Sequence, residues 1–76
     1  MKRIKISVAE FNALARLCSV AGCDWFCKEY RNSKTIDAAD LDCLYAHWFK
    51  NRVCLTADEK NILINLFKMI GHNPEP

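Results

Sequence analysis

The sequence predicts an all-α protein, a compact single-domain bundle of four helices, three long and one short. Apolar residues recur at helical spacing in four segments, capping motifs precede two of these segments, and a glycine follows two of them. The chain has 76 residues, of which 51% are hydrophobic and 26% charged. This composition is typical of a folded globular chain and excludes disordered and low-complexity classes. At about 0.05–0.15 kcal/mol per residue, we expect a free energy of unfolding of roughly 4–11 kcal/mol.

The first long helix is predicted to begin after Ser7 and to end at Gly22. Ser7 and Glu10 form the serine and glutamate of a capping box, in which each side chain satisfies a backbone amide of the other residue. Gly22 is suited to the left-handed conformation that ends many helices. The apolar positions of this helix are Phe11, Leu14, Ala15, Cys18 and Ala21. Residues 1–6 are predicted to be an extended arm, because no second segment resembles a strand that could pair with them.

Three further helices complete the predicted bundle of residues 7–71. A short helix extends from a cap at Asp24 to Asn32, and a long one from Asp37 to about Asn51. The last helix begins at Thr56, in a second capping box, and ends at Gly71. The core stripe expected on the 37–51 helix consists of Leu41, Leu44, Tyr45 and Trp48. Residues 72–76 are predicted to be a C-terminal tail.

The charges and the cysteines indicate the class of partner and the cellular compartment to expect. Eleven basic and nine acidic residues give a net charge of +2, which does not require a polyanionic partner. Residues 1–34 have a net charge of +4 and residues 35–76 a net charge of −2, so the molecule is dipolar. The odd number of cysteines, five, and a start without an apolar signal segment favour reduced thiols and a cytoplasmic location. No apolar run is long enough to cross a membrane, so no membrane association is expected.

One set of residues has the composition of a zinc site. Cys23 and Cys27 are four residues apart, as are Cys43 and His47, so each pair projects from one face of a predicted helix. Three thiolates and an imidazole form a competent tetrahedral zinc set. The spacing is not that of a zinc finger or ribbon, and cysteine is among the residue types most often buried. We therefore expect most of this set to pack in the core without a cofactor, with zinc as the alternative.

Other residues are candidates for contact with a protein partner. Adjacent aromatic residues in the two Trp-Phe pairs point about 100° apart, so one core face does not bury both rings of a pair. Four residues of the predicted 37–51 helix lie opposite its apolar stripe. The candidate partner-binding residues are Trp25, Asp40, Cys43, His47, Phe49 and Lys50. An ordinary solvated helix face is the alternative explanation for the polar members.

Three basic residues near Gly22 suggest nucleic-acid binding as an alternative to protein binding. The segment around Gly22 superficially resembles a helix-turn-helix whose second helix would present Lys28, Arg31 and Lys34. The long predicted helix over residues 37–51, the longest candidate to read DNA bases, begins with three aspartates. Phosphates repel these carboxylates, so DNA binding is not favoured. The sequence contains no glycine-rich phosphate loop, HExxH, GxSxG or paired-carboxylate motif, and we do not expect an enzyme.

We therefore predict a small non-catalytic protein that binds a protein partner and acts by steric occlusion. Its size and simplicity favour a regulator or inhibitor encoded by a phage or mobile element, including an antagonist of a bacterial nuclease defence complex. The alternative is a zinc-stabilised or helix-turn-helix-like nucleic-acid-binding module. Self-association into a homodimer is also compatible with the unburied aromatic residues.

Overall fold

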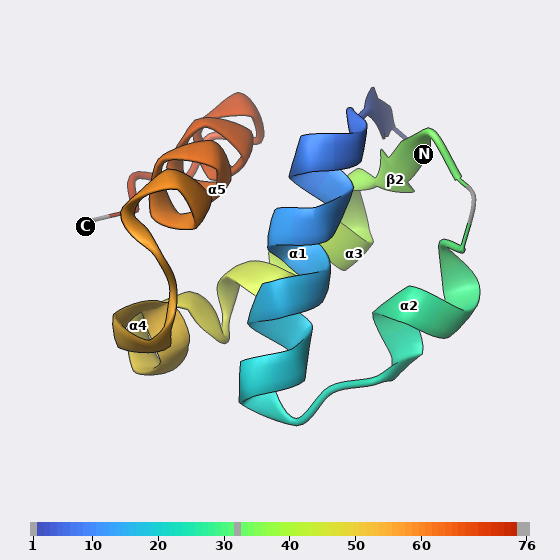
Figure 1. Ribbon diagram of the computed structural model, residues 1–76. Coiled ribbons are helices and arrows are strands. Elements are labelled where there is room, and N and C mark those ends of the chain that lie inside the picture. Colours follow the sequence, from blue (N-terminus) through green and yellow to red (C-terminus); the bar gives the residue numbers. More distant parts are fainter. Residues whose placement is uncertain (1, 32, 75–76) are drawn as a thin grey trace.

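The computed structural model describes residues 2–31 and 33–74. Its α-helices are α1 (Val8–Ala21), α2 (Trp25–Glu29), α3 (Ala38–Tyr45), α4 (Trp48–Asn51) and α5 (Ala57–Met69), with a 3-10 turn η1 (Arg52–Cys54) and strands β1 (Arg3–Lys5) and β2 (Thr35–Asp37). Helix α1 lies between α5 on one side and α2 on the other, and it packs against both (Figure 1). The chain is thus mostly helical and compact, as predicted. In place of four helices, however, the described residues form five α-helices and a small sheet.

The N-terminal segment is extended, but the expectation that it lacks a strand partner is wrong. Strand β1 pairs antiparallel with β2, and Ile4 lies opposite Ile36 in this register. Both isoleucines are buried, with 5% and 0% of their surface exposed. Two further backbone hydrogen bonds, from Ile6 N to Lys34 O and from Ala38 N to Lys2 O (2.9 Å each), extend the pairing. The sheet therefore attaches the N-terminus to the start of α3.

Both predicted capping boxes are present. At α1, the Ser7 hydroxyl accepts a bond from the Glu10 amide (3.1 Å), and the Glu10 carboxylate accepts one from the Ser7 amide (2.7 Å). Thr56 and Glu59 make the same reciprocal pair at the start of α5 (2.9 and 3.2 Å). Because each pair satisfies amides that would otherwise lack a partner, each contributes about 1 kcal/mol to stability.

The glycine at the end of α1 behaves as predicted. Gly22 has φ 79°, its amide donates to Ser19 O (3.3 Å), and the amide of Cys23 donates to Cys18 O (2.8 Å). This pair of bonds is a Schellman motif, which requires a left-handed residue after the helix. Gly71 (φ 89°) ends α5 in the same way.

Gly22→Ala is expected to lower the free energy of unfolding by about 1 kcal/mol, because an alanine in the left-handed region is strained. A Cβ at position 22 would meet no atom within 4 Å among the described residues, so steric contact adds nothing to this cost. Urea denaturation of Gly22→Ala and Gly22→Asn measures the effect, and asparagine, which tolerates this conformation, should be the milder change. Equal losses in the two variants would contradict this explanation.

The predicted helix over residues 37–51 is wrong as a single element. Helix α3 ends at Tyr45 and α4 begins at Trp48. In the turn between them, the amides of Ala46 and His47 bond three residues back, to Cys43 O (3.2 Å) and Leu44 O (3.0 Å). The break accompanies full burial of Trp48, whose ring packs edge-on against Phe67 (5.8 Å between centroids). Burying such a ring stabilises the fold by about 3 kcal/mol or more, which outweighs the roughly 1 kcal/mol of a regular helical hydrogen bond.

The second helix is shorter than predicted, and its expected cap is not formed. Helix α2 begins at Trp25 and ends at Glu29. Within the described part of the chain, the Asp24 side chain makes no capping hydrogen bond and pairs instead with Lys28 (3.3 Å), an exposed contact of little energetic value. Helix α2 is held by the buried Phe26 ring, which contacts the rings of Phe11 (5.1 Å) and Tyr30 (5.4 Å). Among the described residues, no helix is long and apolar enough to span a bilayer.

Candidate binding surface

The half-exposed ring of Phe49 is the centre of the candidate surface. Half of this residue's surface (50%) is open to solvent although its neighbour Trp48 is fully buried. The ring lies edge-on to Tyr45 (5.7 Å between centroids), and the Arg52 guanidinium lies over it (5.1 Å). Val53, which follows Arg52 in the chain, is 78% exposed. We call Tyr45, Phe49, Arg52 and Val53 the aromatic–arginine surface.

Contacts with the core and with the residues after α5 fix the Tyr45 ring of this surface. The Tyr45 ring packs edge-on against the buried Phe67 (5.0 Å) and stacks on the His72 imidazole (3.9 Å, 13° between planes). His72 also bonds to the Asp42 carboxylate and follows the Gly71 turn at the end of α5. Rigid aromatic rings lose little conformational entropy on binding, so a ring fixed in this way is suited to contact a partner.

The charge on this surface is positive. Arg52 forms no ion pair with a described residue, and within those residues one of its terminal nitrogens, Nη1, is buried without a hydrogen-bond acceptor. The exposed Lys50 lies next to Phe49 on α4. Arginine stacked on an aromatic ring and aromatic anchors are both enriched at protein interfaces. The surface therefore suits a partner that offers an apolar contact beside carboxylates or carbonyl oxygens.

The structure disperses the six residues predicted to bind a partner. Trp25 is partly buried and packs edge-on against Phe26 (6.2 Å), and the Asp40 carboxylate accepts a hydrogen bond from Tyr30. His47 faces Cys23, whereas Cys43 and Lys50 are exposed. Because the helix breaks after Tyr45, the polar face expected on one continuous helix does not form.

The cysteines and His47 form a pair rather than the four-ligand set. The sulfur of Cys23 lies 3.4 Å from Nε2 of His47, which ties the end of α1 to the turn before α4. Cys27 and Cys43 are exposed, and no three His, Cys, Asp or Glu side chains of the described chain are grouped to hold a metal ion. The expectation that most of this set is core is also wrong, since two of its three cysteines are exposed and Cys23 is only partly buried.

Two buried groups have strongly raised pKa values. Burial, reinforced by the nearby thiols of Cys23 and Cys27, raises the pKa of Cys18 to about 12. Burial and the hydrogen bond to Asp40 raise the pKa of Tyr30 to about 12, although the Asp37 amide donates to its oxygen (3.2 Å). Both groups are neutral at pH 7, so Cys18 is a poor nucleophile, and Tyr30 acts as a link between α2 and α3.

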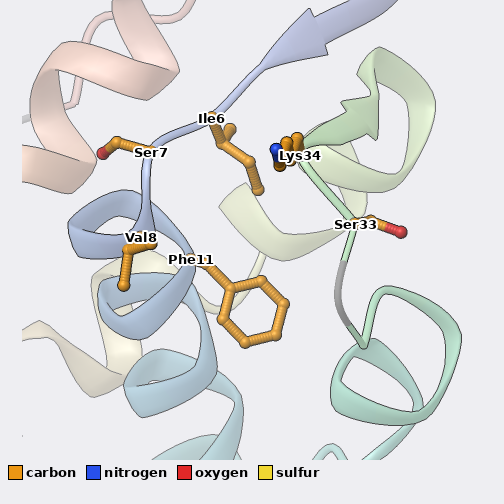
Figure 2. A pocket seen from close by; sticks show the side chains of 6 residues that line it. All are labelled: Ile6, Ser7, Val8, Phe11, Ser33 and Lys34. Carbon is orange, nitrogen blue, oxygen red and sulfur yellow. The ribbon is translucent and has the colours of Figure 1, made fainter.

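The three residues predicted for nucleic-acid contact are divided between two places. Lys28 and Arg31 line a shallow hollow of about 390 Å³ at α2 and the residues after it, where Lys28 also pairs with Asp24. Lys34 lies at a different pocket, between the start of α1 and the chain that enters β2 (Figure 2). The three cations therefore do not line one common hollow.

Sequence reasoning identified Phe49 but missed Tyr45, Arg52 and Val53. Tyr45 was assigned to the core, and it is only partly buried. The four-residue spacing of Tyr45 and Phe49, with Arg52 three residues further on, was the available signal, because residues at these separations are neighbours on a helix.

Comparison of the chain with known protein families, curated proteins and solved structures finds no match.

Proposed function

We propose that the protein is a small non-catalytic regulator that docks on a protein partner and acts by steric occlusion. The observation that carries this proposal is the half-exposed Phe49 ring, fixed between Tyr45 and Arg52. A rigid aromatic residue beside an arginine is the composition of an interface hot spot. The proposal that the blocked partner is a bacterial nuclease complex, and the protein a phage or mobile-element product, rests on the chain's small size alone.

The thiol and imidazole groups favour binding over catalysis. Cys18 is buried and neutral, and the Cys23–His47 pair is the one close thiol–imidazole contact among the described residues. Nucleophilic catalysis also needs a group that orients the base and donors that stabilise an oxyanion. In the described chain, no side chain is bonded to the second ring nitrogen of His47. The same pair is accounted for by its structural role between α1 and α4.

Phe49→Ala is expected to weaken partner binding at least tenfold, about 1.4 kcal/mol, because it removes the anchor ring and the seat of the Arg52 guanidinium. The partner is first captured on the immobilised wild-type chain, and its affinity for each variant is then measured by titration calorimetry. Val8→Ala, which shortens an exposed apolar residue (78%) on α1, is the matched control and should bind as the wild type does.

Arg52→Gln should also weaken binding and should reduce its dependence on salt, since it removes the unpaired cation. Light scattering of the free chain completes the test. A dimer that Phe49→Ala dissociates would identify the partner as a second copy. Equal affinities of the wild type and Phe49→Ala for the captured partner would refute the proposed surface.

A further inference from the structure

A pocket of about 320 Å³ lies at the start of α1, on a different part of the molecule from the aromatic–arginine surface. The turn from β1 into α1 forms one wall and the segment that leads into β2 forms the other (Figure 2). Its lining residues are Ile6, Ser7, Val8, Phe11, Ser33 and Lys34. This volume is at the lower end of the range of about 300–1,000 Å³ that is usual for small-ligand sites.

The interior of the pocket is apolar and anchored to the core. Ile6 is 8% exposed, and the partly buried Phe11 ring packs against the fully buried Phe26 ring (5.1 Å between centroids). Figure 2 shows the Ile6 side chain and the Phe11 ring projecting into the space between the two walls, whereas the Ser33 hydroxyl points away from it. Val8, which is 78% exposed, adds a further apolar side chain to the lining. A ligand with an apolar stem therefore fits this space without displacing a polar group.

The charged groups at the pocket favour an anion. Lys34 is the one charged residue of the lining, and it has no ion-pair partner among residues 2–31 and 33–74. Glu10, the nearest acidic residue in the sequence, is bonded to the Ser7 amide and does not line the pocket. A carboxylate at the Lys34 side would therefore meet an ammonium that has no other partner among the described residues.

We propose that this pocket binds a small carboxylate on an apolar stem, such as a medium-chain fatty acid. The stem packs against Ile6 and Phe11, and the carboxylate pairs with Lys34. This pocket is separate from the aromatic–arginine surface. Ligand binding in the pocket and partner binding at that surface can therefore each occur without the other.

The test is a titration of the ¹⁵N-labelled chain with octanoate, followed by amide chemical shifts. We expect a saturable shift confined to residues near 6–11 and 33–34, with a dissociation constant on the order of 1 mM for a ligand of this size. Octanol, which has the same stem without the charge, should bind about threefold or more weakly.

Lys34→Gln separates the charge from the apolar contact. It should reduce octanoate affinity about threefold and leave octanol affinity unchanged, whereas Lys68→Gln, an exposed lysine on α5, should change neither. Both lysines are exposed, so neither variant is expected to disturb folding. Shifts spread over the whole chain, octanol binding as tight as octanoate binding, or an unchanged octanoate affinity in Lys34→Gln would each overturn the proposal.

Discussion

Trp48→Ala is expected to lower the free energy of unfolding by about 3–5 kcal/mol. Trp48 is fully buried, and its ring packs edge-on against Phe67, which is also fully buried. Alanine would leave a cavity where the Trp48 ring contacts Phe67 of α5. The turn between α3 and α4 would then no longer be accompanied by a buried aromatic ring. Since the whole chain is expected to have about 4–11 kcal/mol of stability, this single change should bring it close to unfolding at 25 °C.

Thermal and urea denaturation measure this loss, and Phe49→Ala is the matched control. Phe49 is the next residue in the same helix and is also aromatic, but half of its surface is exposed. Its truncation should cost about 1 kcal/mol, which corresponds to about 4–8 °C in melting temperature for a domain of this size. If Phe49→Ala were as destabilising as Trp48→Ala, then Phe49 would be a core residue and the proposed binding surface would lose its anchor.

The helix ends were predictable because their signals are local. Ser7 with Glu10 and Thr56 with Glu59 each satisfy backbone amides within four residues, so no tertiary context is needed to identify them. Gly22 is equally local, since a left-handed residue is needed wherever a helix ends in a Schellman motif.

The small sheet and the break after α3 were not predictable in this way. Thr35–Asp37 contains three residues, too few for an alternating pattern, and it becomes a strand because β1, more than 30 residues earlier, pairs with it. The break after Tyr45 contains neither glycine nor proline. It depends on where the Trp48 ring packs against α5, and this is a tertiary contact that helical periodicity does not encode.

The candidate surface was missed for the same reason. The exposure of Phe49 followed from its position beside Trp48. The role of Tyr45, however, depends on its contacts with Phe67 and His72, and that of Arg52 on its place over the Phe49 ring. The four possible zinc ligands are not grouped in the described chain, because spacing along two helices does not determine which faces meet. Cys23 and His47 do meet, at 3.4 Å, while Cys27 and Cys43 point to solvent.

The chain is expected to lose stability steeply at alkaline pH, by roughly 3–4 kcal/mol between pH 9 and pH 11. In the folded chain, the pKa of Cys18 is raised from 9.0 to about 12 by burial and by the neighbouring thiols. The pKa of Tyr30 is raised from 10.0 to about 12 by burial and by its bond to Asp40. The unfolded chain releases these two protons first, so above pH 9 it binds fewer protons than the folded chain. The free energy of unfolding therefore falls as the pH rises, by up to about 1.4 kcal/mol per pH unit for each group.

Cys18→Ala and Tyr30→Phe separate the two contributions. Cys18→Ala should be less stable than the wild type at pH 7, because it removes a buried sulfur, but its stability should fall less between pH 9 and pH 11. Tyr30→Phe should lose about 1–2 kcal/mol at pH 7, since it leaves the Asp37 amide and the Asp40 carboxylate without their partner, and should show a smaller loss above pH 10.

Urea denaturation at half-unit pH intervals, in reducing buffer, gives these profiles, and Cys54→Ala controls for the loss of an exposed thiol. A Cys18→Ala profile as steep as that of the wild type would show that the alkaline loss arises elsewhere, because alanine has no proton to release. A flatter profile would show that the Cys18 thiol must stay neutral for α1 to pack. In that case Cys18 is a structural residue.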